Sequence, residues 1–273
     1  MSNTAVNTGK DFWDATITMS PSAATYHDEK RITSPYDNNP VDLTLFVSCY
    51  NEEEFITDTL NVIVGAMKII ARTYEILVID DGSKDQSVAL VQKYIAEHPE
   101  LNIILRVNKK NKGLAQNYVD GAFIGRGKYY RLICGDNAEP IETIVQVLQC
   151  IGDADIIVPY YVSAQGKSAH RQFISKSFTR VINLVSGNKI NYYNGLHVHL
   201  RFNIMRWYPN TRGFGFQAGL LCTLLDRGFT YKQVPVVTIE RRGGAGNALN
   251  WKNLRSVMHT ILGVLFQRLA PWS

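Results

Sequence analysis

The apolar run at residues 76–79 stops abruptly at the segment Asp80-Asp81-Gly82-Ser83. A short apolar run bounded by turn residues is typical of a buried strand in a parallel sheet, and Gly82 permits the tight turn that would start the next helix. Ligands of open α/β sheets bind outside the carboxyl ends of the strands, where Asp80 and Asp81 would lie. Taken alone, the segment fits a ligand-binding loop and a simple helix cap equally well.

From residue 43 onward, short apolar runs alternate with amphipathic stretches. We expect strands at residues 43–48, 76–79, 102–107, 129–134, 155–158 and 231–239. We expect helices at residues 52–71, 87–95, 114–124, 140–150, 171–185 and 216–227. Strands and helices in regular succession predict βαβ units, and therefore an α/β, Rossmann-like fold with a mostly parallel sheet flanked by helices.

The chain divides into three parts by composition. Residues 1–40 are rich in Ser, Thr, Asn and Asp and show no sustained period, which predicts an extended or partly disordered arm. Residues 41–250 form the predicted domain. Residues 251–273 mix apolar side chains at helical spacing with Arg255 and Arg268, which predicts a C-terminal amphipathic helix. Packing of this helix on the protein's own core or in a dimer and contact with a membrane surface both fit its pattern.

Charge and cysteine usage limit the partners of this chain of 273 residues. The net charge of +5 and the pI near 8.9 favour contact with phosphates or anionic lipid, while the dispersed basic residues and missing zinc spacing argue against nucleic acid. Four widely spaced cysteines indicate reduced thiols. With no visible secretory signal or membrane-spanning run, we expect a cytoplasmic protein, soluble or peripheral at the cytoplasmic membrane face. A homo-oligomer is compatible with the sequence.

Polar loops follow four of the predicted strands. They are Ser48-Cys49-Tyr50-Asn51-Glu52, Asp80-Asp81-Gly82-Ser83, the segment 108–115 and Gly135-Asp136-Asn137-Ala138-Glu139. Because the carboxyl ends of parallel strands meet at one edge of a sheet, we expect these loops to form a single pocket. The third loop places lysines beside a helix N-terminus, which favours phosphate, and Asp136 suits a hard divalent cation that also binds a diphosphate.

In their order and spacing these loops resemble the inverting family 2 glycosyltransferases, which have a GT-A fold. The matching motifs are Tyr50-Asn51-Glu52, Ile79-Asp80-Asp81-Gly82-Ser83, Asn111-Lys112-Gly113 and Cys134-Gly135-Asp136. The resemblance covers about residues 43 to 250. Within this family the chain is similar to polyprenyl-phosphate sugar transferases such as dolichyl-phosphate mannose synthase. The matching positions in the second half are Arg171, Phe178, Asn183, Asn194-Gly195, Gly213-Phe214-Gly215-Phe216-Gln217, Val234-Pro235-Val236, Arg241 and Gly244.

The resemblance implies transfer of a sugar from a GDP- or UDP-linked donor with inversion, and it assigns roles to single residues. The implied donor-binding residues are Ser48, Tyr50, Glu52, Asp80, Asp81, Ser83, Lys112, Gly113 and Asp136. Asp136 would also hold Mg²⁺ or Mn²⁺ and act in catalysis together with Arg241. Arg171 and Arg241 would bind the acceptor or its phosphate.

Two departures from the family pattern affect the expected chemistry. Cys134 replaces the first acid of Asp-x-Asp, so metal binding would be weak and would depend on Asp136, diphosphate oxygens and water, with Glu139 as a further candidate. Residues 216–221 contain no carboxylate to act as a general base. A phosphate acceptor needs none because its second pKa is near 6, which favours a polyprenyl phosphate. Transfer to a carbohydrate or protein hydroxyl, and donor binding without turnover, are the alternatives.

Overall fold

The computed structural model describes residues 41–164, 169–208, 215–238 and 258–266. Within these residues a seven-stranded sheet has the order β3-β2-β1-β4-β6-β5-β7. The strands are β1 (Leu43–Cys49), β2 (Tyr74–Asp80), β3 (Ile103–Val107), β4 (Tyr129–Cys134), β5 (Ile156–Ala164), β6 (Val198–Leu200) and β7 (Tyr231–Thr238). Strand β6 pairs antiparallel with β4 and β5, and the other pairings are parallel. The predicted mostly parallel sheet is confirmed.

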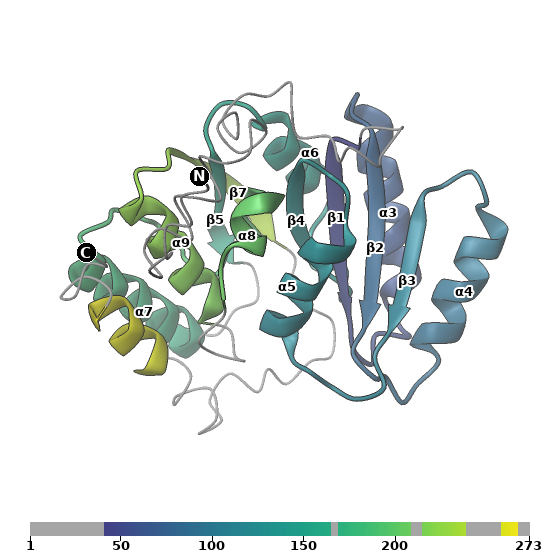
Figure 1. Cartoon of the computed structure of the whole chain (residues 1–273), viewed down its shortest axis with the longest axis horizontal. Helices are drawn as coiled ribbons and strands as arrows, with labels where there is room; N and C mark the ends of the chain where they lie inside the picture. The colour runs from purple at the N-terminus through teal and green to yellow at the C-terminus, as the bar shows by residue number, and fades with distance from the viewer. Residues whose placement is uncertain (1–40, 165–168, 209–214, 239–257, 267–273) are drawn as a thin grey trace, which may run out of the picture.

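Helices flank this sheet on both faces (Figure 1). They are α3 (Ile56–Ile69), α4 (Ser87–Glu97), α5 (Leu114–Ile124), α6 (Ile141–Gln149), α7 (Ala169–Ser186), α8 (Arg201–Met205), α9 (Phe216–Asp226) and an unlabelled helix over residues 258–266. Side chains alternate across a strand, so β1 contributes to two separate cores. Leu45 packs with Ile63 of α3 and Ile144 of α6, whereas Phe46 packs with Ala115 of α5 and Phe216 of α9.

The structure corrects the expected elements at three places. The first helix begins at Ile56 rather than at residue 52, and β5 continues to Ala164 rather than ending at residue 158. Strand β6 and helix α8 were not predicted. They lie in an irregular aromatic segment, where three strand residues are too few to show an alternating pattern.

The predicted C-terminal helix is present over residues 258–266, where its buried side packs on the protein itself. Val264 is 3% exposed within the second core, and Thr260 packs against the backbone of Gly215 at the start of α9. Met258, Leu262 and Phe266 remain exposed. The arm at residues 1–40 and the remainder of residues 251–273 lie outside the described residues.

Across the described ranges, no helix has both the length and the apolar character required to cross a membrane.

Candidate active site

Strands β1, β2 and β4 end side by side at one edge of the sheet. The register pairs Cys49 of β1 with Asp80 of β2, and Ser48 of β1 with Cys134 of β4. The loops that follow these strands therefore start at the same level. This is the edge at which open α/β sheets bind ligands.

The first two loops are joined by backbone to side-chain hydrogen bonds. The Asn51 amide donates to Ser83 Oγ at 2.9 Å, and the Lys84 amide donates to Asn51 Oδ1 at 2.8 Å. The Glu52 amide donates to Ser87 Oγ at 2.9 Å. Asn51 has a φ of 55°, a left-handed conformation that asparagine tolerates better than most residues. These bonds fix the backbone that directly follows Tyr50, which is 48% exposed.

Asp80 has one carboxylate oxygen that no described residue contacts by a hydrogen bond. Its Oδ1 accepts bonds from the amides of Gly82 and Ser83, both at 3.0 Å. Its Oδ2 is buried, and the whole residue is 1% exposed. Because buried polar atoms nearly always have a partner, an unpaired carboxylate oxygen at this edge indicates a site for a ligand or water.

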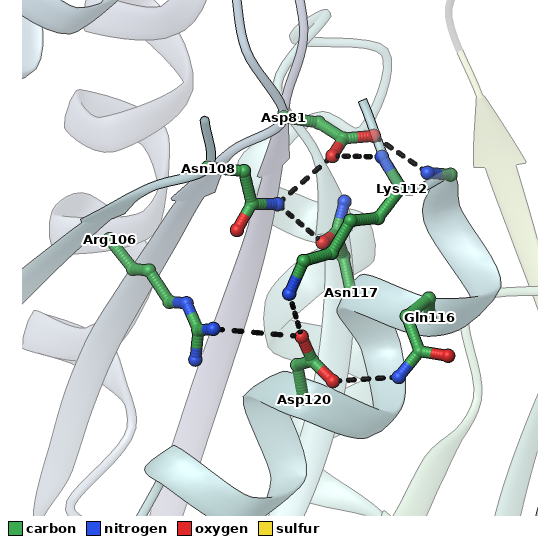
Figure 2. Close-up of polar contacts among 8 residues, drawn as sticks. Asp81, Arg106, Asn108, Lys112, Gln116, Asn117 and Asp120 are labelled. Carbon is green, nitrogen blue, oxygen red and sulfur yellow. Dashed lines mark hydrogen bonds and ion pairs between the residues drawn. The ribbon is translucent and has the colours of Figure 1, made fainter. Parts of the chain in front are cut away.

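Asp81, in contrast, uses both oxygens within the protein (Figure 2). Its Oδ1 accepts bonds from Asn108 Nδ2 at 2.9 Å and from the Lys112 amide at 2.8 Å. Its Oδ2 accepts a bond from the Gly113 amide at 2.9 Å. Asn108 Nδ2 also donates to Asn117 Oδ1 at 2.8 Å. Asp81 therefore holds the third loop and the start of α5 against the end of β2.

The Lys112 side chain runs along α5 to Asp120, as Figure 2 shows. Its Nζ lies 2.7 Å from Asp120 Oδ2, and Gln116 Nε2 donates to Asp120 Oδ1 at 2.7 Å. Burial would raise the pKa of Asp120, but the bonds from Lys112 and Gln116 hold that pKa below its usual range. The ammonium is thus paired within the protein, and its contact with a donor stays a prediction.

Asp136 is half-buried in the turn after β4. The amide of Gly135 donates to Ser48 O at 2.9 Å, which sets the turn beside the first loop. Ala138 donates through its amide to Asp136 Oδ1 at 3.3 Å, and Ala138 O accepts a bond from Thr238 Oγ1 at 3.0 Å. The end of β7 is therefore tied to the Asp136 turn.

The two predicted arginines are only partly placed. Arg171 lies in the first turn of α7, but its side chain is outside what the structure describes. Arg241 follows Thr238 by three residues and also lies outside the described residues. Their roles stay predictions.

The described residues contain no group of three or more His, Cys, Asp or Glu side chains arranged to hold a metal ion. Burial raises the pKa of the Cys134 thiol, and the charges of Asp136 and Glu139 raise it further, so the thiol is un-ionised in the metal-free protein. Glu139 Oε1 accepts a bond from Arg131 Nη2 at 2.7 Å in the protein interior. The second oxygen of Glu139, Oε2, is buried without a partner among the described residues. The Asp136 carboxylate accepts one long hydrogen bond, so it can bind Mg²⁺ or Mn²⁺ jointly with a diphosphate.

Ser87 and Arg131 shape the site but were not predicted from the sequence, and Asn108 was predicted only as part of the third loop. Ser87 and Asn108 fix the loops through their side chains, and Arg131 lies buried beneath the Asp136 turn. Arg131 sits within an apolar strand and gave no signal in the sequence.

The chain belongs to Glycosyl transferase family 2, because residues 44–210 match the model of that family. It is 34% identical over 110 residues to dolichyl-phosphate beta-glucosyltransferase of Dictyostelium discoideum, a match that covers 37% of this chain and 34% of that protein. It is 26% identical over 257 residues to dolichyl-phosphate beta-glucosyltransferase ALG5C of Trichomonas vaginalis, with 83% and 75% of the two chains covered.

Two solved structures share the fold at low sequence identity. Glucosyl-3-phosphoglycerate synthase of Mycobacterium tuberculosis, in complex with Mn²⁺, UDP and phosphoglyceric acid, has a TM-score of 0.63 and 15% identity, covering 82% of this chain and 78% of that one. Mannosyltransferase PcManGT of Pyrobaculum calidifontis, in complex with GDP-Man and Mn²⁺, has a TM-score of 0.59 and 15% identity, covering 92% and 79%. These similarities establish a GT-A-like fold.

Proposed function

We propose that this protein transfers a hexose from a UDP- or GDP-linked donor to a polyprenyl phosphate, with inversion at the anomeric carbon. The observation that carries the proposal is the meeting of the Tyr50, Asp80 and Asp136 loops at one sheet edge in a family 2 chain. The names of the relatives support the acceptor, since two of them are dolichyl-phosphate glucosyltransferases.

The donor would lie across the carboxyl ends of β1, β2 and β4. Asp80 offers its unpaired oxygen to a donor hydroxyl or base N–H, and the exposed Tyr50 ring offers a surface for the base. Asp136 would hold the divalent cation, which when bound stabilises the negative charge that grows on the leaving diphosphate. Arg241 is proposed to add charge-assisted hydrogen bonds to the same phosphates.

The acceptor side favours a group that is already ionised. Helix α9 contains no carboxylate before Asp226, its last residue, so its N-terminal half supplies no general base. A phosphate monoester carries most of its second charge at neutral pH and needs no base. Its oxygen would attack the anomeric carbon opposite the diphosphate, forming one C–O bond as the other breaks.

A lipid acceptor also requires access to a membrane surface, and α7 offers a suitable face. We name this the outer face of α7. It consists of the exposed side chains Phe173, Lys176, Arg180, Val181 and Leu184. Apolar side chains interspersed with cations suit an anionic lipid surface. All four cysteines are free thiols, which supports a place at the cytoplasmic face of the membrane.

The test is to incubate the full chain with polyprenyl phosphate and radiolabelled UDP-glucose or GDP-mannose. We expect a labelled glycolipid of inverted anomeric configuration, lost in Asp136→Ala and kept in Asp153→Ala, which changes an exposed carboxylate. Transfer to a sugar or protein hydroxyl instead would establish the second enzymatic alternative. Donor binding with no product from any acceptor would establish a binding protein without turnover.

A further inference from the structure

A guanidinium group is buried in the middle of the sheet. Arg131 lies on β4, between β1 and β6, and is 0% exposed. Burying an ion pair carries a large desolvation cost, and apolar side chains of similar volume often stabilise a fold as well or better. Stabilisation of the fold therefore does not by itself explain why an arginine is buried here. The contacts of Arg131 indicate a further role.

Arg131 joins the segment after Asp136 to a densely packed part of the backbone. Its Nη2 donates to Glu139 Oε1 at 2.7 Å, and its Nε donates to Leu196 O at 3.2 Å. The Arg131 and Glu139 side chains are 0% and 5% exposed. Next to Leu196, the Gly195 backbone packs so closely on β5 that an added Cβ would lie 2.2 Å from Pro159 O. This leaves the Leu196 carbonyl little freedom to move.

The Asp136 turn is therefore held on two sides. Before Asp136, the Gly135 amide bonds to Ser48 O, and Gly135 O accepts a bond from Thr59 Oγ1, both at 2.9 Å. After Asp136, Thr238 Oγ1 donates to Ala138 O at 3.0 Å, and Arg131 fixes Glu139. Within the turn, the carboxylate itself accepts only a long bond from the Ala138 amide, at 3.3 Å, among the described residues. The position of the Asp136 carboxylate therefore depends on both anchors.

We propose that Arg131 and Glu139 are positioning residues for Asp136. Together with the bond from Thr238 to Ala138 O, the pair fixes the carboxyl-terminal side of the turn, so that the Asp136 carboxylate points at the place where a cation and a diphosphate would bind together. This inference rests on the proposed function, because it assigns the pair to the metal and diphosphate part of the donor site. The loops of Tyr50 and Asp80 do not depend on it.

The test removes both charges at once in the full chain, with Arg131→Met and Glu139→Leu combined. Mn²⁺ binding is followed by electron paramagnetic resonance in the presence of UDP and of GDP. We expect the double variant to unfold cooperatively, as the wild type would. Its Mn²⁺ affinity in the nucleotide complex should fall about 10- to 100-fold, as is typical when residues that orient a metal ligand are replaced. Nucleotide affinity without Mn²⁺ is expected to stay at the wild-type value.

The exposed pair Lys232 and Asp153 is a matched control, because its Nζ to Oδ2 distance is also 2.7 Å while its side chains are 46% and 50% exposed. Lys232→Met with Asp153→Leu should leave both affinities unchanged. Wild-type Mn²⁺ affinity in the folded Arg131/Glu139 double variant would overturn the inference. If that variant does not fold, Glu139→Gln decides, with weaker Mn²⁺ binding expected and unchanged binding overturning it. A wild-type protein that binds neither nucleotide overturns the proposed function as well.

Discussion

At the scale of single residues, two adjacent carboxylates at the end of β2 have different tasks. Both carboxylate oxygens of Asp81 accept hydrogen bonds, from Asn108, Lys112 and Gly113. Asp80, in contrast, keeps a buried oxygen without a partner among the described residues. The sequence predicted that both acids reach the ligand edge. It could not separate them, because the partners of Asp81 lie 27 to 32 residues further along the chain.

Substituting each acid by asparagine should separate stability from nucleotide binding. Asp81→Asn places an amide group against amide donors, and we expect it to lower the free energy of unfolding by about 1–3 kcal/mol. Asp80→Asn keeps the Oδ1 acceptor for Gly82 and Ser83 and changes only the unpaired oxygen. We expect it to leave stability near wild type and to weaken UDP or GDP binding about 10- to 100-fold.

Urea unfolding and isothermal titration with UDP and GDP measure the two effects, and each variant is the other's control. A loss of stability in Asp80→Asn as large as that in Asp81→Asn would contradict this division of roles.

At the scale of elements, the sequence predicted the first half of the fold well and the second half less well. Strands β1 to β4 each show an apolar run followed by a polar loop. The three-residue strand β6 shows no such pattern, and it pairs antiparallel with β4 over residues 129–131, which are distant from it in sequence. Non-local pairing of this kind has no local signature.

Strand β6 and the residue before it bring two histidines into the core, which predicts acid sensitivity. Burial and the charge of Arg131, opposed by a hydrogen bond with the Tyr192 backbone, together lower the pKa of His197 to about 3. Burial and the neighbouring His197 lower the pKa of His199. An unfolded histidine, with a pKa near 6.5, binds a proton below that pH while the folded one does not. The histidine's contribution to stability is therefore complete above about pH 6.5 and is lost as pH falls from 6.5 toward 3.

His197→Leu isolates this effect. Between pH 6 and pH 4 we expect the free energy of unfolding of the wild type to fall more steeply than that of the variant, by about 1.4 kcal/mol per pH unit. Urea unfolding at each pH measures the slopes. Parallel curves for the two proteins would show that His197 is protonated in the folded state.

The outer face of α7 predicts binding to anionic vesicles. Phe173 and Leu184 are 67% and 84% exposed, so replacing both by glutamate should leave the core intact. The change removes apolar area that would enter the lipid and adds negative charge, and we expect vesicle affinity to fall at least about tenfold. Phe123 on α5 is 59% exposed and serves as the matched control, since Phe123→Glu should leave co-sedimentation with phosphatidylserine vesicles unchanged. Equal loss in both variants would contradict a specific face.

At the scale of the whole molecule, the parallel sheet assembles the proposed donor site from loops that are distant in sequence. Residues 50, 80 and 136 meet because β2, β1 and β4 are neighbours in the sheet and end at one level. The sequence predicted this meeting because the position of a ligand site follows from the topology. The hydrogen bonds that lock the loops together depend on single side chains such as Ser87, and these required the structure.

The same arrangement predicts how metal and nucleotide stabilise the fold together. We assign the cation to Asp136, and the described residues offer no three-ligand cluster, so Mn²⁺ alone should not raise the melting temperature measurably. UDP or GDP at about 100 times its Kd should add about 2.7 kcal/mol to the free energy of unfolding, because it binds only the folded protein. Mn²⁺ added with the nucleotide should raise stability further, since diphosphate oxygens complete the coordination.

Asp136→Asn should abolish this additional Mn²⁺ effect and keep the nucleotide effect, as followed by thermal unfolding. Stabilisation by Mn²⁺ without nucleotide would require a metal site outside the described residues, and the assignment of the cation to Asp136 would then be wrong.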